Sequence, residues 1–356
     1  MTKSVLVAMS GGVDSLIAAW KLKRAGYHVN GVYFHFWKWN TSENEYGRDS
    51  DRLNNLAEKI GVDLVEVDAQ EIFKAKVISP MVEMIEKGLT PNPCIFCNPE
   101  MKFSLLINYA DQMGITHIAT GHYVISREKK DNLIGLFKAE DKAKDQSYFL
   151  CKLDQEILKR VIFPLGYTNK KENIVLATKL GLQIEKIYES QDLCFLSNHS
   201  YSEFINMAFP QMITPGVIKN IDGKIIGKHK GLPNYTIGQR KGIEIPAAEP
   251  YYVVAKDTLS NTLIVGSAAD LKFREMVVSN VNWISGAQVL CKDCYVKIRY
   301  KSPDHPCSVK KMDERNYRVI SSQDLRDLTP GQYAVFYDGD ELLGGGMISS
   351  VLWNHV

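Results

Sequence analysis

Residues 4–24 read SVLVAMSGGVDSLIAAWKLKR and decide the fold class of the chain. The apolar run 4–9 predicts a short strand, and a glycine turn follows it at once. Apolar residues then recur at positions 13, 16, 17 and 20, the spacing of a helix, and Gly26 is a typical helix stop. A strand, a tight turn and a helix in this order are typical of the first unit of a parallel sheet covered by helices.

The same alternation continues through the first half of the chain. Apolar and β-branched runs at 29–34, 62–67 and 117–120 predict strands, and periodic segments at 52–60 and 105–113 predict helices between them. The first half is therefore predicted to be an α/β domain with a parallel sheet.

The second half has a different sequence pattern, in which short β-like runs are separated by turns. These runs lie at residues 216–218, 225–227, 251–255, 262–265, 295–300, 317–320, 333–337 and 346–351. They favour one or two small β modules, with soft boundaries near residues 200 and 270.

Composition bounds the class of protein. The chain has 356 residues, of which 45% are hydrophobic and 24% charged, and 43 basic residues against 41 acidic ones give a net charge of +2. This ordinary mixture excludes disordered, collagen-like and coiled-coil proteins. The apolar runs are too short for a membrane span or a signal peptide, so we expect a soluble, cytoplasmic protein. Its seven cysteines then favour reduced thiols, metal ligands or redox chemistry over a disulfide framework.

The glycine turn has the features of a phosphate site. Backbone N–H groups, two hydroxyls and the positive end of a helix converge in Ser10-Gly11-Gly12-Val13-Asp14-Ser15. The glycines let the backbone approach an anion, whereas Asp14 would repel bare phosphate and is better explained as a magnesium contact. The alternative is a tight turn in which Asp14 or Ser10 caps the helix.

The hexapeptide in its strand, turn and helix context resembles the PP-loop of the ATP pyrophosphatase superfamily. Members of that superfamily split ATP into AMP and pyrophosphate and adenylate an oxygen before it is displaced. The resemblance implies ATP as cofactor and a nucleotide site in which Phe34 and Gly121 border the adenosine. The remaining residues implied for this site are Ala8, Met9, Ser10, Gly11, Gly12, Val13, Asp14 and Ser15.

The stretch 90–103, TPNPCIFCNPEMKF, is the second informative one. Asn98 is a typical N-cap and Pro99 a typical first helical residue, so we expect Cys97 just ahead of a helix amino terminus. A thiol at that position is pushed toward the nucleophilic thiolate, and Lys102 would help if it points back.

Two other interpretations of these cysteines stay open: a structural zinc site and a buried free thiol. The second Cys-x-x-Cys pair, at 291 and 294, is too far along the chain for the spacing of a zinc ribbon. By default we treat as structural Cys151, Cys291, Cys294 and Cys307.

Several motifs in one order resemble the tRNA-specific 2-thiouridylases, which thiolate the wobble uridine of certain anticodons. The motifs lie at residues 10–15, 92–98, 119–123, 144–148, 192–195 and 235–242. The resemblance implies a PP-loop catalytic domain at 1–200, a small central tRNA-binding domain at 201–270 and a carboxy-terminal β-barrel at 271–356.

The resemblance also implies roles for two cysteines. Cys97 would be the nucleophile and Cys194 the persulfide carrier, with Asp192 orienting the sulfur or handling a proton. ATP would adenylate the C2 oxygen of the uridine, and persulfide sulfur would replace that oxygen. One thiol bears sulfur and the other resolves the persulfide, which closes a disulfide that must later be reduced. The expected partners are tRNA and a persulfide-donating sulfur carrier or cysteine desulfurase.

Three alternatives remain at this point. Cys94 occupies a site where other family members carry Asp, so Cys94, Cys97 and Cys194 would in one of them ligate a [4Fe–4S] cluster with an open iron. The second alternative is an amidating synthetase of the same superfamily, although no glutaminase motif is present. The third is a non-catalytic tRNA-binding protein that retains the loop.

The near-neutral charge conceals a basic stretch. Between residues 219 and 241 there are six Lys or Arg against Asp222, a local charge of +5 that suits phosphate binding. Tyr201 and Tyr235 are expected to add stacking surfaces. A second basic strip contains Lys297, Arg299, Lys301, Lys310 and Lys311.

Further tRNA contacts follow from the resemblance alone. Asn92, Pro93 and Cys94 would border the flipped-out target base, which must leave the stack to reach both a phosphate and a sulfur. The other residues implied to touch tRNA are His122, Lys144, Asp145, Gln146, Arg299, Tyr300 and Gln332.

Overall fold

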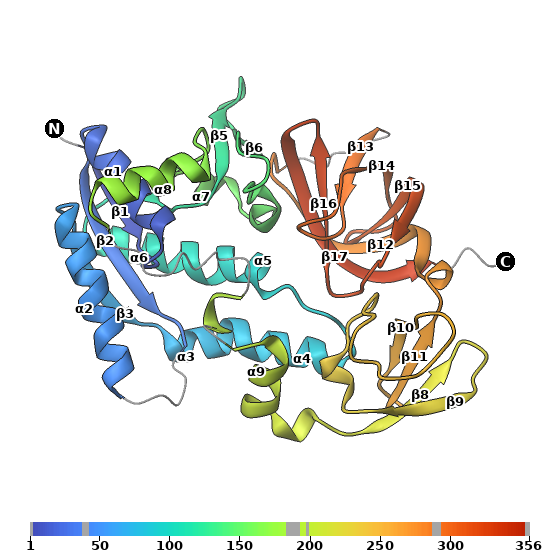
Figure 1. The fold of residues 1–356 in the computed structure, drawn as a ribbon. Helices are drawn as coiled ribbons and strands as arrows, with labels where there is room; N and C mark the ends of the chain where they lie inside the picture. The colour runs from blue at the N-terminus through green and yellow to red at the C-terminus, as the bar shows by residue number, and fades with distance from the viewer. Residues whose placement is uncertain (1–2, 38–42, 183–192, 197–198, 287–292, 353–356) are drawn as a thin grey trace.

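A computed structural model describes residues 3–37, 43–182, 193–196, 199–286 and 293–352 (Figure 1). Three sheets organise these residues: a parallel one near the amino terminus, a small one in the middle and a barrel near the carboxyl terminus. The fold class expected from the sequence is confirmed.

The first sheet has five strands in the order β3-β2-β1-β4-β7, and all neighbours are parallel. Its strands are β1 (Ser4–Ala8), β2 (His28–His35), β3 (Asp63–Asp68), β4 (His117–Ala119) and β7 (Val161–Ile162). In β1, Leu6 packs into one core cluster while Val5 and Val7 pack into another. Both faces of the sheet are therefore buried, as expected when helices cover both sides.

Helices α1 and α8 cover one face of this sheet, and α6 packs on the other. The α-helices are α1 (Val13–Arg24), α2 (Glu43–Lys59), α3 (Gln70–Phe73), α4 (Ser79–Glu86), α5 (Pro93–Cys97), α6 (Ser104–Gln112), α7 (Gln155–Leu158), α8 (Lys170–Lys179) and α9 (Tyr201–Ala208). Two π-helical turns, η1 (Lys74–Ile78) and η2 (Asn98–Phe103), join α3 to α4 and α5 to α6. Each pair is thus one continuous helix whose face is rotated by the wider turn.

The central sheet has the order β10-β11-β8-β9. Its strands are β8 (Gly216–Asn220), β9 (Ile225–His229), β10 (Tyr252–Asp257) and β11 (Thr262–Gly266). Tyr235 is only 4% exposed and belongs to the core beneath this sheet. The expectation that Tyr235 offers a stacking surface is therefore wrong, because its ring is buried in the core of the central sheet.

The third sheet closes into a six-stranded barrel. Strand order runs β12-β15-β14-β13-β16-β17, and β12 pairs with β17 to complete the circle. The strands are β12 (Lys272–Trp283), β13 (Cys294–Lys297), β14 (His305–Lys311), β15 (Asn316–Arg326), β16 (Tyr333–Asp338) and β17 (Glu341–Leu352). Their inward residues form a separate core around Trp283 and Phe336.

A hairpin from the first half of the chain extends the barrel sheet. Strands β5 (Val124–Glu128) and β6 (Ile134–Lys138) pair with each other, and Leu136 of β6 pairs with Leu342 of β17. Lys138 donates to Asp304 at 2.5 Å across the same junction. The amino-terminal half and the barrel are therefore joined by backbone as well as side-chain hydrogen bonds.

Short 3₁₀ turns connect these elements, at η3 (Ser147–Leu150), η4 (Cys194–Leu196), η5 (Pro210–Met212), η6 (Leu232–Asn234) and η7 (Ala269–Leu271). Among the helices of the described ranges, none is long and apolar enough to cross a bilayer.

Candidate active site

The glycine turn leads directly into α1. Gly11 has a φ of +74°, a left-handed conformation that glycine adopts without strain. Gly12 is the N-cap residue and has no side chain with which to cap the first turn. The side chains of Ser10 and Asp14 make their described hydrogen bonds elsewhere, so the capping alternative is wrong. The start of α1 therefore presents backbone N–H groups to an anion.

The hydroxyl of Ser15 braces the loop from inside. It accepts a hydrogen bond from the Ser10 N–H at 3.1 Å and donates one to the Gly12 carbonyl at 3.0 Å. Ser15 is 3% exposed, whereas Ser10 is exposed. Of the two hydroxyls in the motif, that of Ser15 shapes the loop and that of Ser10 remains near solvent.

Gly121 lies against this loop. A Cβ atom at Gly121 would lie 2.7 Å from the carbonyl carbon of Asp14 and 2.8 Å from the nitrogen of Ser15. The segment after β4 is thus brought to the start of α1, as the expected nucleotide site requires. The side chains of Met9 and Phe34 are 2% and 6% exposed and belong to the core beside the loop, while Ala8 is half-buried.

Asp14 is held by Lys170 and Tyr123, to neither of which the sequence analysis assigned a role. Both of its carboxylate oxygens lie 2.7 Å from the Nζ atom of Lys170, and the Tyr123 hydroxyl donates to Oδ1 at 2.8 Å. With both oxygens engaged by protein, Asp14 does not fit the expected role of magnesium ligand.

Lys170 and Tyr123 are the functional candidates that sequence reasoning missed. Lys170 is the first residue of α8, directly after the N-cap Asn169. Acidic residues are favoured at that end of a helix because of its dipole, so a lysine there is unusual. That misplaced charge is the signal by which Lys170 could have been found.

The helix that carries Cys97 begins earlier than predicted. It starts at Pro93 with Asn92 as N-cap and continues through η2 into α6. Asn98 is 3% exposed, and its Nδ2 group donates to the carbonyl of Phe149 at 3.0 Å. Cys97 therefore lies inside a continuous helix, and the expectation that it precedes a helix amino terminus is wrong.

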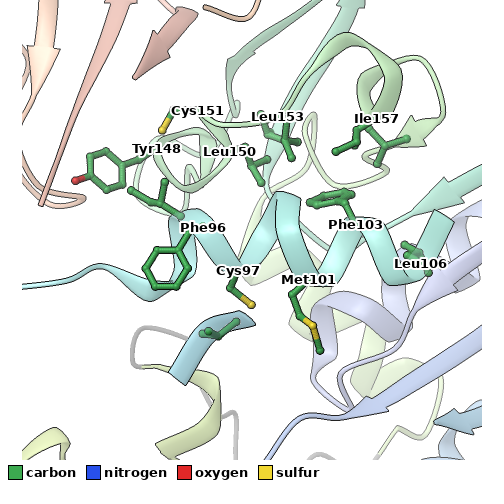
Figure 2. Close-up of a cluster of buried hydrophobic side chains, with 14 of the residues drawn as sticks. Phe96, Cys97, Met101, Phe103, Leu106, Tyr148, Leu150, Cys151, Leu153 and Ile157 are labelled. Carbon is green, nitrogen blue, oxygen red and sulfur yellow. The ribbon is translucent and has the colours of Figure 1, made fainter. Parts of the chain in front are cut away.

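The thiol of Cys97 is accordingly not activated by a helix end. Cys97 is 7% exposed, and burial raises its pKa well above the ordinary value. Burial likewise raises the pKa of Cys94 to about 12. Figure 2 shows Cys97 and Met101 on one side of the helix, with Leu150 and Cys151 on the other. In the form of the protein without substrates, Cys94 and Cys97 are neutral thiols at physiological pH.

Cys194 lies close to both of these cysteines. Desolvation raises its own pKa, and its charge contributes to the raised pKa of Cys94 and of Cys97. Cys194 itself is exposed at the start of η4. Cys97 and Cys194, for which the resemblance implied a joint role, thus lie within electrostatic range of one another and of Cys94.

Lys102 is the cation of this cluster. It follows Cys97 by one π-helical turn, and its charge lowers the pKa of Cys94, Cys97 and Cys194, against the larger effect of burial. The same charge, together with burial, holds the pKa of His122 well below its usual value. His122 is therefore a neutral imidazole whose Nδ1 atom lies 2.8 Å from the Thr120 hydroxyl.

Within the described ranges, no group of three His, Cys, Asp or Glu side chains has an arrangement suited to a metal ion. The geometry of Cys94, Cys97 and Cys194 therefore gives no support to the [4Fe–4S] hypothesis. Asp192 and Cys291 lie outside the described residues.

The pKa of Cys94 leads to a first prediction. In the protein without substrates, the alkylation rate of Cys94 by iodoacetamide is expected to rise about tenfold per pH unit up to about pH 9, because thiolate is the reactive form. Peptide mass spectrometry at a series of pH values measures this rate. A plateau near neutral pH would contradict the raised pKa, and the control is the denatured protein, in which the rate is half-maximal near about pH 8.5 and levels off above that pH.

Two of the residues expected to touch tRNA, Asp145 and Gln146, make hydrogen bonds within the protein. Asp145 is 5% exposed, and its carboxylate accepts hydrogen bonds from the Ala139 N–H at 3.0 Å and the Ser147 hydroxyl at 2.8 Å. The Asp145 carboxylate is therefore not part of the surface that can contact tRNA. Gln146 bonds the backbone of Tyr123 in both directions, at 2.9 and 2.8 Å, and Lys144 is half-buried.

Arg299 and Gln332 bridge parts of the fold. The Nη2 group of Arg299 donates to the carbonyl of Ile237 at 2.9 Å and to the Thr329 hydroxyl at 2.6 Å. The Nε2 group of Gln332 donates to the carbonyl of Thr90 at 2.9 Å, two residues before Asn92. The ring of Tyr300 packs on Phe149 with a centroid distance of 4.5 Å. In the structure, these three side chains make protein contacts that join the barrel to the rest of the chain.

A second prediction tests the role of Arg299. Arg299→Ala is expected to lower the free energy of unfolding by about 3 kcal/mol, since the half-buried carbonyls of Ile237 and Asp327 lose their charged donor. Thermal or urea unfolding measures the change. The control is Arg318→Ala, which removes an exposed ion pair with Glu275 and should cost no more than about 1 kcal/mol. Equal stability of both variants would contradict the bridging role.

The basic stretch of the central sheet is mostly exposed. Lys219 is half-buried, and Lys230 forms an ion pair with Glu244 at 3.0 Å. The exposed members are Lys224, Lys228, Lys230, Arg240 and Lys241. Tyr201 is half-buried and packs against the main core. The exposed Lys and Arg side chains of this stretch therefore form a basic surface, but the buried ring of Tyr235 is not part of it.

A parallel sheet whose first strand leads through an uncapped glycine loop into a helix is the arrangement expected of PP-loop nucleotide enzymes. Comparison with known families agrees in three consecutive parts. Residues 3–198 match a tRNA methyl transferase HUP domain, residues 202–267 a tRNA methyl transferase PRC-barrel domain, and residues 273–348 an aminomethyltransferase β-barrel domain.

Full-length relatives carry a more specific name, tRNA-specific 2-thiouridylase MnmA. The protein of Burkholderia pseudomallei (strain 1106a) is 40% identical and covers 98% of this chain and 94% of its own length. That of Caldanaerobacter subterraneus, named MnmA 1, is 39% identical, with 97% of each chain covered. That of Methylobacillus flagellatus is 37% identical over 99% of this chain and all of its own. The chain belongs to the family of tRNA-specific 2-thiouridylases.

Proposed function

We propose that this protein is an ATP-dependent tRNA 2-thiouridylase that replaces the C2 oxygen of the wobble uridine with sulfur. The single observation that carries the proposal is the grouping of Cys97 and Cys194 about Lys102, in a chain that also has a PP-loop. A tRNA methyltransferase or an amidating synthetase has no need of two neighbouring thiols. The names of the full-length relatives support the same activity.

In this proposal the loop 10–15 holds the phosphates of ATP. The backbone N–H groups at the start of α1 and the dipole of that helix supply the positive potential. Gly121 keeps the neighbouring segment close enough to border the nucleotide. Transfer of AMP to the C2 oxygen of the uridine then releases pyrophosphate and makes that oxygen a leaving group.

Sulfur arrives as a persulfide on Cys194, which is the exposed member of the cluster and so the one accessible to a donor protein. The terminal persulfide sulfur attacks C2, AMP leaves with the oxygen, and a disulfide links Cys194 to the base. The Cys97 thiolate attacks the Cys194 sulfur, which frees the 2-thiouridine and closes a Cys97–Cys194 disulfide. An external thiol then reduces that disulfide to two thiols.

The charge of Lys102 assists the steps in which a thiolate forms. Burial disfavours the thiolate of Cys97, and the protein atoms around the sulfur of Cys194 raise its pKa even though that residue is exposed at the surface. Lys102 opposes these effects at both positions. In this proposal Asn92 and Pro93, at the start of the same helix, border the extruded base. A tRNA substrate and a donor of persulfide sulfur, a sulfur carrier or a cysteine desulfurase, are the partners required. We expect the enzyme in the cytoplasm, where tRNA is modified.

The activity is tested by incubating the full chain with unmodified tRNA, ATP, magnesium and a persulfide donor, followed by mass spectrometry of the nucleosides. We expect 2-thiouridine; a methylated uridine in a parallel reaction that contains a methyl donor would instead support the methyl transferase activity in the descriptions of the matched domains. Pyrophosphate release stimulated by tRNA would exclude a protein that only binds tRNA. Folded protein that binds tRNA but makes no 2-thiouridine would overturn the proposal.

The cluster alternative is tested separately with Cys94→Ala. If iron-free protein with this substitution still thiolates tRNA, the three cysteines do not need a [4Fe–4S] cluster for the reaction. Loss of thiolation together with loss of bound iron, while ATP and tRNA still bind, would favour the cluster over the persulfide route.

A further inference from the structure

Lys170 is a buried cation that the proposed sulfur chemistry does not use. Its side chain is 8% exposed, and its Nζ atom lies 2.7 Å from each carboxylate oxygen of Asp14. Its backbone N–H donates to Oδ2 of Asp141 at 3.0 Å, which fixes the start of α8. A lysine so buried has few conformations available, so the ion pair is a built feature of the fold.

A second donor completes the arrangement around Asp14. The Tyr123 hydroxyl donates to Oδ1 of Asp14 at 2.8 Å and accepts from Nδ2 of Asn173 at 3.0 Å. Burial and the charge of Asp14 raise the pKa of Tyr123, so this hydroxyl remains protonated. The carboxylate of Asp14 is therefore held on the side of α8 by an ammonium group and a phenol.

This arrangement solves an electrostatic problem of the loop. Asp14 lies in the first turn of α1, where the N–H groups and the helix dipole favour an anion. An unpaired carboxylate there would repel the phosphates of a nucleotide, and the repulsion is strong where protein excludes water. An ammonium group at hydrogen-bond distance cancels that charge.

We propose that Lys170 is a positioning residue for ATP. Its ammonium group neutralises Asp14, and the loop 10–15 can therefore accept a polyphosphate. The inference rests on the proposed placement of ATP phosphates in this loop. A direct contact between Lys170 and a phosphate is the competing possibility, and the variants below separate the two.

The first measurement is the Kd of ATP for the full chain without tRNA, determined by calorimetry. Lys170→Met is expected to raise this Kd at least about tenfold, because it leaves an unpaired carboxylate beside the phosphates. The matched control is Lys171→Met, which changes the next, exposed lysine of the same helix and should leave the Kd unchanged. An unchanged Kd in folded Lys170→Met protein would overturn the proposal.

The second measurement separates neutralisation from direct contact. If Lys170 acts by cancelling the charge of Asp14, the double variant Asp14→Asn, Lys170→Met, which has the same net charge at this site as the wild-type pair, should bind ATP about as tightly as the wild type. If the double variant binds ATP at least about tenfold more weakly than the wild type, Lys170 acts on the phosphate itself and the proposal is wrong. The double variant also serves if Lys170→Met does not fold, because it restores a neutral site.

A loop variant tells failure of this inference from failure of the nucleotide assignment. Ser10→Glu adds a negative charge at an exposed loop position and should abolish ATP binding if the loop holds the phosphates. Wild-type affinity in Ser10→Glu would overturn the loop assignment, and the Lys170 proposal with it. Weak binding by Ser10→Glu and normal binding by Lys170→Met would overturn the Lys170 proposal alone. Binding of tRNA, which neutralisation of Asp14 does not affect, should be unchanged in Lys170→Met.

Discussion

Cys194→Ser is expected to abolish tRNA thiolation, with a loss of at least about a thousandfold, because a hydroxyl cannot carry a persulfide. Cys194 is the exposed cysteine of the cluster and the one that a sulfur donor can reach. Pyrophosphate release stimulated by tRNA should persist, since adenylation of the uridine does not require this thiol. Nucleoside mass spectrometry and a pyrophosphate assay on the same samples measure the two half-reactions.

Cys97→Ser should fail at a different step. Persulfide sulfur on Cys194 still attacks the adenylated base, but no second thiol releases it, so a disulfide-linked complex of enzyme and tRNA accumulates. Denaturing electrophoresis would show this complex, and a reducing thiol would dissolve it. Such a complex in Cys194→Ser as well, or its absence from Cys97→Ser with all thiolation intact, would contradict the assigned roles.

The matched control for both variants is Cys151→Ala. Cys151 is fully buried in the same core cluster but lies on the other side of the helix from Cys97 (Figure 2). Its loss leaves a small cavity and lowers stability, without touching the sulfur route. Thiolation at a permissive temperature should therefore continue.

The resemblance implied a joint role for Cys97 and Cys194, whereas the local sequence predicted the chemical state of Cys97 incorrectly. Asn98-Pro99 has the composition of a helix start, and that local signal is outweighed by Asn92-Pro93, where the helix begins. The π-turn at Asn98–Phe103 tolerates Pro99 inside a continuous helix and buries Asn98 against Phe149. Local propensity gives no warning of such a tertiary hydrogen bond.

The parallel sheet was predictable because its buried strands are apolar runs that alternate with periodic helices. The barrel was harder, and β12 and β14 were not identified from the sequence. The burial of β12 alternates only in part, and it carries Asn280 at a φ of +51° within its length. Such strands read as polar or irregular segments until their partners β15 and β17 are in place.

The sequence does not predict which charged residues far apart in the chain pair with one another. Asp14 and Lys170 are 156 positions apart, and nothing in either neighbourhood indicates the other. Likewise Arg299 was counted in a basic strip for tRNA, whereas its guanidinium is committed to protein carbonyls and a hydroxyl. A count of charges along the chain cannot separate cations that face solvent from cations that hold the fold together.

Gly121→Ala is the second substitution for which we expect a large effect, because the new methyl group would meet backbone atoms that cannot rotate away. The Cβ atom would lie 2.7 Å from the carbonyl carbon of Asp14, 2.8 Å from the nitrogen of Ser15 and 2.9 Å from the oxygen of Asp14. Relief requires a shift of the segment after β4 or of the first turn of α1, and overpacking of this kind costs about 1–3 kcal/mol. If that cost falls on the nucleotide-binding conformation, ATP affinity drops by about 10- to 100-fold.

Calorimetric titration with ATP measures this change, and thermal unfolding shows whether the cost falls on the whole fold instead. Gly135→Ala is the matched control, because its Cβ would meet flexible side-chain ends of Lys129 and Phe137 at 3.1 Å. That variant should bind ATP normally. Normal ATP affinity and normal stability in Gly121→Ala would mean that the backbone around Asp14 is free to move, and the close approach that defines the nucleotide site would then not be a constraint on the loop.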